Sequence, residues 1–97
     1  MLTYVSLYHW TEQGIKNVKD TVKRAEAAQA TIEGVGGRLI TLLWTQGAYD
    51  LISIAEFPDE DTAMAYAASI GMQGNVRTET LRAFSANDIK RILQKLP

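Results

Sequence analysis

The stretch Gln46-Gly47-Ala48-Tyr49-Asp50 separates two apolar runs, Arg38 to Thr45 and Leu51 to Phe57. Runs of this length, rich in aliphatic and β-branched residues, are typical of strands. A short link containing glycine between two such runs predicts a β-hairpin. Both runs carry apolar residues on both alternating faces, which indicates that both sides of the sheet are covered. The remaining strands and helices are predicted from the segments that precede and follow this hairpin.

Further strands and helices are predicted on both sides of the hairpin. Strands show alternating patterns, helices show apolar residues three and four positions apart, and glycine, proline and capping residues mark their ends. The predicted elements are a strand from Leu2 to Trp10, a weak helical turn capped by Thr11, a helix from Asp20 or Thr21 to Gly36-Gly37, a helix from Asp59 to about Ile70 that Gly71 and Gly74 break, a strand from Val76 to Phe84 and an amphipathic helix after the capping box Ser85-Ala86-Asn87-Asp88.

The order βαββαβ plus a terminal helix predicts an α+β fold of the ferredoxin-like kind, in which two helices cover one face of an antiparallel sheet. With 97 residues and no linker-like stretch, residues 1–97 form a single domain. In the first strand, the aliphatic face of Val5 and Leu7 suits packing against the helices. The aromatic face of Tyr4, Tyr8 and Trp10 suits a second sheet or a cavity. A sheet stacked from a second copy of the chain would cover that face.

Composition excludes several classes of protein. Ten Lys and Arg against eleven Asp and Glu give a formal charge of −1, which offers no field to hold nucleic acid. No apolar run approaches the roughly 20 residues of a membrane helix, and the amino terminus does not resemble a signal peptide. The absence of cysteine excludes disulfide and thiolate chemistry and is compatible with a cytoplasmic protein.

Several separated segments, in order, resemble one known family. They are Trp10-Thr11-Glu12-Gln13-Gly14-Ile15-Lys16-Asn17-Val18-Lys19-Asp20, Gly36-Gly37, Gly47-Ala48-Tyr49-Asp50 and Gly74-Asn75-Val76-Arg77-Thr78-Glu79-Thr80-Leu81-Arg82-Ala83-Phe84. Together they resemble the GYD domain family, with Gly47, Tyr49 and Asp50 at the element that gives the family its name. Such proteins are similar to dimeric α/β barrels, so the resemblance implies a homodimer in which two sheets form one barrel. It implies no particular reaction.

The single histidine, His9, is the first candidate for chemistry. It can serve as a general base or as an axial haem ligand if its side chain points into a cavity. It can equally be a histidine at the end of a strand, bonded to backbone or water. With one His and no Cys, structural zinc is excluded, and the chain carries no nucleotide-binding motif, so no metal or cofactor is expected.

Two pairs of residues are further candidates for catalysis or ligand binding. Tyr49 and Asp50 can act as acid and carboxylate base at the rim of a cavity, or can be turn residues. Neighbours in an extended strand point to opposite faces, which argues against their meeting one substrate. Arg77 and Glu79 share a strand face and can form an ion pair across a dimer or anchor a ligand carboxylate.

The aromatic residues Tyr4, Tyr8, Trp10 and Trp44 either line a ligand pocket or form the dry core of a dimer. The first alternative predicts a homo-oligomeric α/β barrel that binds a small apolar or aromatic molecule in the barrel cavity. By analogy with similar barrels it would be a cofactor-free isomerase or monooxygenase. The second alternative predicts a non-catalytic sensor or assembly module. Haem binding through His9 is a third.

Overall fold

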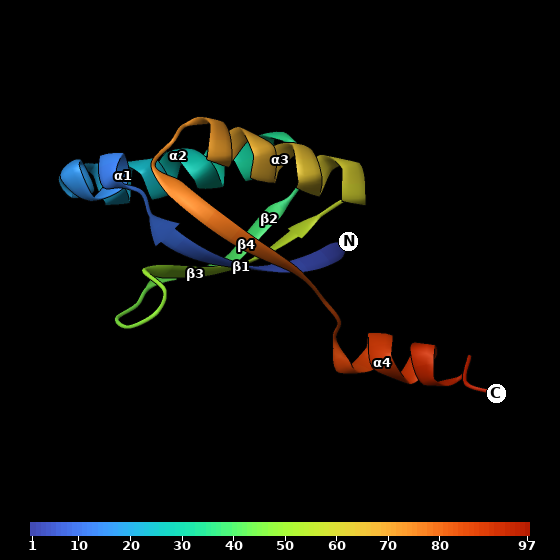
Figure 1. Cartoon of the computed structure of the whole chain (residues 1–97). Coiled ribbons are helices and arrows are strands. Elements are labelled where there is room, and N and C mark those ends of the chain that lie inside the picture. Colours follow the sequence, from blue (N-terminus) through green and yellow to red (C-terminus); the bar gives the residue numbers. More distant parts are fainter.

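The chain forms one four-stranded antiparallel sheet with two long helices on one face (Figure 1). The computed structural model describes residues 1–97. The strand order is β2-β3-β1-β4, so the second and fourth strands form the edges of the sheet. The strands are β1 (Leu2–Trp10), β2 (Arg38–Trp44), β3 (Leu51–Phe57) and β4 (Val76–Ala83). This topology confirms the predicted ferredoxin-like α+β fold, and every strand ends within one residue of its predicted limit.

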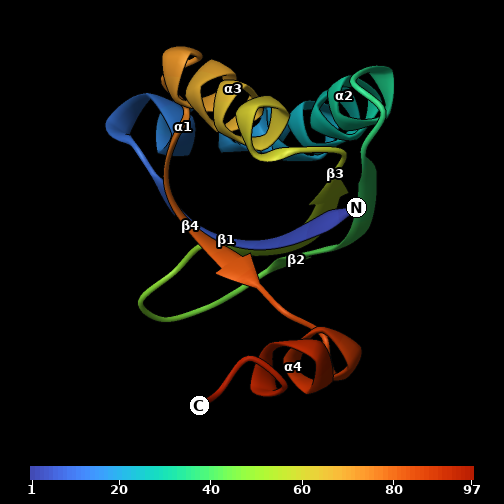
Figure 2. The ribbon, with the colours of Figure 1, turned by 90° about the vertical axis from the view of Figure 1, so that its right-hand side faces the viewer.

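The helices occupy two separate regions. Figure 2 shows α2 and α3 side by side above the sheet, whereas the terminal helix lies below it, past the end of β4. None of the helices is both long and apolar enough to cross a membrane. Their bounds are α1 (Glu12–Lys16), a 3₁₀ turn η1 (Val18–Asp20), α2 (Thr21–Gly34), α3 (Glu60–Met72) and α4 (Ala86–Leu93).

Local hydrogen bonds fix where the helices begin. The Thr11 side chain accepts from the amide of Gly14, and the Asp59 carboxylate accepts from the amide of Thr62 at 2.7 Å. Ser85 and Asp88 form the predicted reciprocal capping box in front of α4. These side chains satisfy amides that have no partner inside the helix.

The end of α3 differs from the prediction. The helix continues through Gly71 to Met72, and the chain turns at Gly74, which has a φ of +79°. Glycine in mid-helix costs only about 1 kcal/mol, whereas a positive φ strongly favours glycine. The second of the two glycines therefore ends this segment.

The helix-covered face of the sheet is the aromatic face. In β3, Leu51, Ser53, Ala55 and Phe57 are buried, and their partners in β1 across the ladder include Tyr4 and Tyr8. The prediction that the aliphatic face would meet the helices was wrong. The apolar positions that α2 and α3 turn toward the sheet are mostly alanine, so the large rings of β1 fill the space beneath them. The alanines are Ala25, Ala28, Ala63 and Ala67.

The core lies between β3 and the two helices. Ile32, Ala55, Phe57 and Ala63 form its buried cluster, and Tyr4, Leu39 and Tyr66 pack against it. Apolar residues recur at three and four positions from Val22 to Val35 and form a stripe whose two ends are exposed, at 54% for Val22 and 42% for Val35. The middle of the stripe, and not its ends, faces the sheet.

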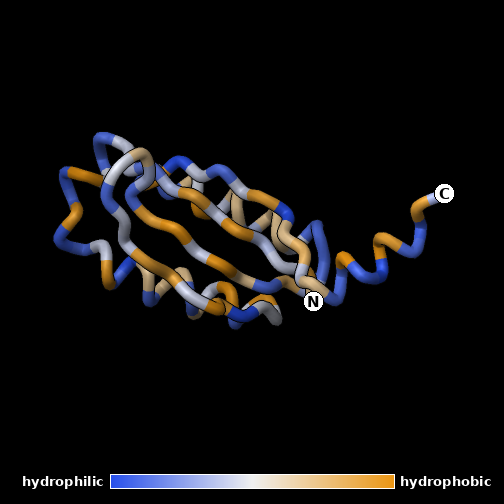
Figure 3. The backbone as a smooth tube through the Cα atoms, turned by 90° about the horizontal axis from the view of Figure 1, so that it is seen from below, coloured by the Kyte–Doolittle hydropathy of each residue, from blue (hydrophilic) through white to orange (hydrophobic).

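The opposite face of the sheet is bare in the single chain. Val5 and Leu7 lie on it, opposite Ile54 and Ile52 in the β1–β3 ladder. Leu81, which pairs with Val5 in β4, is 52% exposed. Figure 3 views the chain from the side of this face and shows apolar positions recurring along neighbouring strands and along α4.

The loop that follows β2 is longer than a tight hairpin turn. The amide of Thr45 donates to the carbonyl of Asp50 at 2.8 Å, which closes the loop at its base. Gly47, with a φ of +106°, takes a conformation that favours glycine. The hairpin prediction is confirmed, although residues 45–50 form a longer loop and not a tight turn.

Candidate functional site

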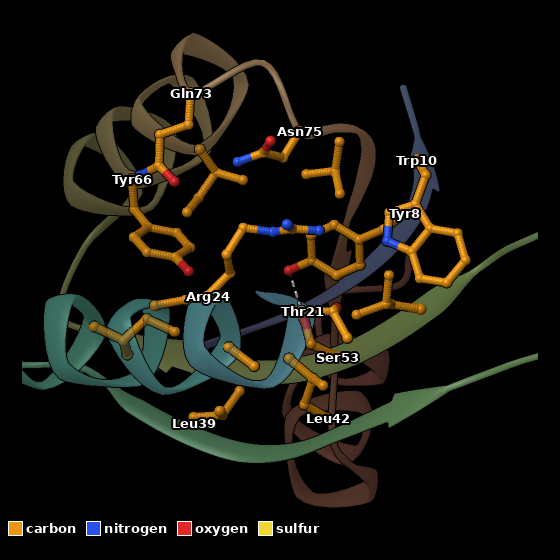
Figure 4. A pocket seen from close by; sticks show the side chains of 16 residues that line it. Tyr8, Trp10, Thr21, Arg24, Leu39, Leu42, Ser53, Tyr66, Gln73 and Asn75 are labelled. Carbon is orange, nitrogen blue, oxygen red and sulfur yellow. Dashed lines mark hydrogen bonds between the residues drawn. The ribbon is translucent and has the colours of Figure 1, made fainter. Parts of the chain in front are cut away.

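A cavity of about 70 Å³ lies between the sheet and the helix layer (Figure 4). Its walls come from all four strands, from α2 and α3, and from the turn after α3. They are mostly apolar, which is typical of sites for small molecules. The lining residues are Tyr8, Trp10, Thr21, Arg24, Ala25, Ala28, Ile32, Leu39, Leu42, Leu51, Ser53, Tyr66, Ile70, Gln73, Asn75 and Val76.

A smaller hollow of about 20 Å³ adjoins the cavity and shares Tyr8, Ser53 and Tyr66 with it. Tyr4 and Phe57 line the far part of this hollow, and their rings meet edge to face with centroids 6.0 Å apart. The space beneath the helices therefore extends along β1 from Trp10 toward Tyr4.

Two tyrosine hydroxyls are among the polar groups of the cavity, Tyr8 on the sheet and Tyr66 on α3. Tyr8 Oη lies 2.8 Å from Ser53 Oγ, so this pair forms a hydrogen bond between β1 and β3. Burial raises the pKa of Tyr66 well above its usual range, and the neighbouring Tyr8 adds to that shift. Both effects disfavour a phenolate, so Tyr66 stays a neutral hydroxyl at physiological pH.

Trp10 places a hydrogen-bond donor without an acceptor in the cavity wall. Its indole Nε1 is buried and has no partner. The nitrogen-bearing edge of the ring is turned toward the other labelled side chains in Figure 4. By contrast, Nε1 of Trp44 donates to Thr21 Oγ1 at 3.0 Å. A buried donor left unpaired costs about 1–3 kcal/mol, so the two tryptophans differ in what they offer a ligand.

Arg24 contributes the only formal charge in the lining. Its guanidinium donates to the carbonyl of Asn17 at 2.7 Å and to the carbonyl of Gly14 at 3.4 Å. The ion pairs of the chain are Lys16–Glu12, Arg38–Glu56 and Arg91–Asp88, so no carboxylate neutralises Arg24. The cavity is thus positively charged at one end.

A second polar cluster lies on the bare face of the sheet. Tyr49 Oη donates to Glu79 Oε2 at 3.0 Å, and the rings of Tyr49 and His9 are 4.8 Å apart. Both the hydrogen bond to Glu79 and the charge of that carboxylate raise the pKa of Tyr49. Arg77 lies opposite His9 in the β1–β4 ladder. His9 does not line the cavity, so an imidazole on this face cannot hold a group bound beneath the helices.

Asp50 and Tyr49 do not form a pair. Asp50 Oδ2 accepts from the backbone amide of Trp10 at 2.9 Å, and the Asp50 amide donates to the Tyr8 carbonyl at 2.8 Å. Asp50 therefore ties the end of the loop to β1, while Tyr49 extends over the bare face toward Glu79. The two side chains therefore lie at different places, as the alternation of side chains along a strand suggests.

The structure sorts the predicted site residues into two groups. Tyr8 and Trp10 line the cavity, Tyr4 lines the adjoining hollow, and Trp44 lies outside both, bonded to α2. Arg77 and Glu79 lie on the bare face, where Glu79 accepts from Tyr49 and forms no ion pair with Arg77. No group of three or more His, Cys, Asp or Glu side chains is placed to hold a metal ion.

Sequence reasoning missed most of the cavity lining, including the polar residues Arg24, Ser53 and Tyr66. Arg24 stands among the charged residues of a helix whose polar side suggests contact with solvent, and Ser53 interrupts an otherwise apolar strand. Tyr66 is the one aromatic residue among the alanines of α3. Two features of the sequence indicate such a site. They are a lone serine on the buried face of a strand and a tyrosine among alanines.

Comparison with known proteins places the chain in a family. The family model described as "GYD domain" matches residues 4–93. The chain belongs to the GYD domain family. A solved structure, the protein TTHA0845 from Thermus thermophilus, is similar at 23% identity with a TM-score of 0.55, covering 89% of this chain and 96% of that one. This likeness supports the fold. Among proteins with curated descriptions, none matches the chain.

Membership of the GYD family confirms the resemblance carried by Gly47, Tyr49 and Asp50. In this chain these residues form the loop that closes the β2–β3 hairpin and reaches over the bare face. They do not line the cavity. The loop that gives the family its name therefore lies apart from the cavity, whereas Trp10, Asn75 and Val76 from the other matching segments line it.

Proposed function

We propose that this GYD domain binds a small, mostly apolar molecule in the cavity between its sheet and its helices. The observation that carries the proposal is the buried Trp10 Nε1, a donor that has no acceptor in the protein. An oxygen acceptor on a ligand would satisfy it, while the apolar walls would take up a ring or a short hydrocarbon chain. The ligand would bind beneath the helices of each subunit, and not in a space enclosed between two sheets.

The charge of the site supports a carboxylate or another anionic group on the ligand. Arg24 lines the cavity and has carbonyl partners but no acidic partner. Hydrogen bonds to a charged group contribute more than neutral ones, about 1.5–3 kcal/mol. An anion that accepts from Trp10 and lies near Arg24 fits this lining better than a neutral molecule does.

The lining supports recognition more than catalysis. It contains no carboxylate and no imidazole, the groups that most often move protons at neutral pH. Burial keeps the Tyr66 hydroxyl protonated by raising its pKa. An isomerase would need a general base, and none lines the cavity. We therefore favour a binding or sensing role over isomerase or monooxygenase chemistry.

The two tryptophans allow a matched test of the binding proposal. The Trp10→Phe variant removes the unpaired donor, and the Trp44→Phe variant removes one that is already bonded within the protein. With short-chain carboxylates and benzoate as probes, calorimetry should show about a ten- to hundredfold weaker affinity for Trp10→Phe. Trp44→Phe should bind as the wild type does. Equal affinities for the three proteins would rule out Trp10 as a ligand contact.

We also infer that the bare face of the sheet pairs with the same face of a second copy. Leu43 is 56% exposed and Leu81 is 52% exposed, at opposite edges of an aliphatic surface. Charge supports self-association, because Arg77 and Glu79 both lie on this face and neither has an ion-pair partner in its own chain. A two-fold axis can bring Arg77 of one copy to Glu79 of the other. Sheets stacked in this way would form the dimeric barrel.

A further inference from the structure

We propose that α4 is an exchanged arm, whose apolar side packs at the β2 edge of the bare sheet face of a second copy of the chain, beside the part that the stacked sheets cover. The inference rests on the proposed homodimer and adds an element that stacking of the sheets alone does not require. It starts from the position of α4, which Figures 1 and 2 show projecting away from the sheet and from both other long helices.

The exposed apolar residues of α4 indicate that this helix packs against another surface. Ile89, Ile92 and Leu93 recur at three and four residues, and Leu96 continues the row beyond the end of the helix. Three of these four side chains are exposed, at 42% for Ile89, 54% for Leu93 and 67% for Leu96. A helix of this length is marginal in water without packing. Its apolar row therefore needs a surface that its own chain does not supply.

The short segment that joins β4 to α4 directs the helix away from its own sheet. Only Phe84 and Ser85 separate β4 from α4, and Ser85 is extended, with φ −74° and ψ 168°. The Arg82 guanidinium lies 4.4 Å from the centre of the Phe84 ring and also donates to the carbonyl of Thr3. The radius of gyration, 14.7 Å, exceeds the roughly 13 Å of a compact domain of about this size, as expected for a projecting segment.

Charge favours a second copy as the partner. Three of the ten basic residues and one of the eleven acidic residues lie in residues 86–97, so the arm carries +2 and residues 1–85 carry −3. Arm and body attract each other, and the arm of one chain does not reach the sheet of its own body. The bare sheet face of another copy belongs to a body of opposite net charge and carries exposed apolar residues such as Leu43.

The absence of cysteine permits a direct cross-linking test. Leu93→Cys protein is mixed with Leu43→Cys protein under mild oxidation, so that a disulfide between the two variants can only join different chains. The control mixture replaces Leu43→Cys with Met64→Cys, whose site is 72% exposed on the helix layer. We expect the 93–43 disulfide to form well ahead of the 93–64 disulfide. Equal yields of the two would overturn the arm exchange.

The dimer dissociation constant provides a second test of the exchanged arm. Leu93→Ser removes one apolar side chain from the arm, and Gln94→Ser changes the adjacent exposed residue. Sedimentation should show a dimer dissociation constant raised about tenfold or more by Leu93→Ser, and unchanged by Gln94→Ser. A stable dimer with the same constant in both variants refutes the arm and leaves the sheet-stacked dimer standing. A wild-type monomer refutes both, and neither result bears on ligand binding in the cavity.

Discussion

Gly14 is buried where the chain leaves β1, and a side chain has no room there. A Cβ atom on this residue would lie 1.9 Å from the carbonyl oxygen of Asn75. That carbonyl accepts the amide of Thr11 at 3.1 Å, and the Thr11 hydroxyl donates to the carbonyl of Gly74. The turn into β4 is therefore held tightly against the start of α1, beside the end of the cavity formed by Trp10 and Asn75.

Replacing Gly14 by alanine should destabilise the domain. The methyl group meets backbone, which cannot rotate away as a side chain can, so we expect a loss of about 1–3 kcal/mol or more in urea denaturation. Gly34→Ala is the control, because no atom lies within 4 Å of the place that the added methyl group would take on α2. It should be neutral or stabilising by up to about 1 kcal/mol. Equal stabilities of the two variants would contradict the close approach at Gly14.

Individual residues were predictable where their role is local. The caps at Thr11, Asp59 and Ser85 follow from the hydrogen-bonding habits of short polar side chains, and all three form as expected. The role of Asp50 depends on a strand 40 residues away in the sequence, because its carboxylate bonds the amide of Trp10. No local pattern distinguishes that role from catalysis.

At the scale of elements, the sequence predicts the strands well and their environment less well. Alternation, glycine and proline mark the strand ends, and those signals are local. Which face the helices cover depends on how side-chain volumes match across the layer. The alanines of α2 and α3 leave room for Tyr4, Tyr8 and Trp10, so the aromatic face is covered and the aliphatic face is left bare.

The bare face gives a prediction about β4. Leu81→Asp places a charge within the aliphatic surface, and desolvating that charge would oppose stacking of two sheets. Sedimentation equilibrium should find a dimer for the wild type and a monomer for Leu81→Asp. The control is Met64→Asp, which adds the same charge to an exposed site on α3 and should leave the mass unchanged. A wild-type monomer at micromolar concentration, or a Leu81→Asp dimer, would count against stacking through this face.

At the scale of the whole molecule, the two sides of the sheet differ in their chemistry. The helix-covered side holds a cavity with an unpaired indole donor and an unneutralised guanidinium. The bare side holds an aliphatic surface and the Tyr49–Glu79 cluster. The sequence predicted Tyr8 and Trp10 as pocket residues, but Arg24, Ser53 and Tyr66 were beyond sequence reasoning because they come from three elements that meet only when the helices dock on the sheet.

The most direct test of ligand binding in the cavity is the nuclear magnetic resonance signal of the Trp10 indole N–H. In the Trp44→Phe variant, Trp10 is the only tryptophan, so the indole region of a ¹⁵N–¹H spectrum holds a single peak. If the cavity binds carboxylates through this donor, titration with short-chain carboxylates and benzoate should shift that peak progressively to saturation. The neutral analogue benzyl alcohol should shift it less. An indole peak that stays in place throughout the carboxylate titrations would contradict binding at Trp10.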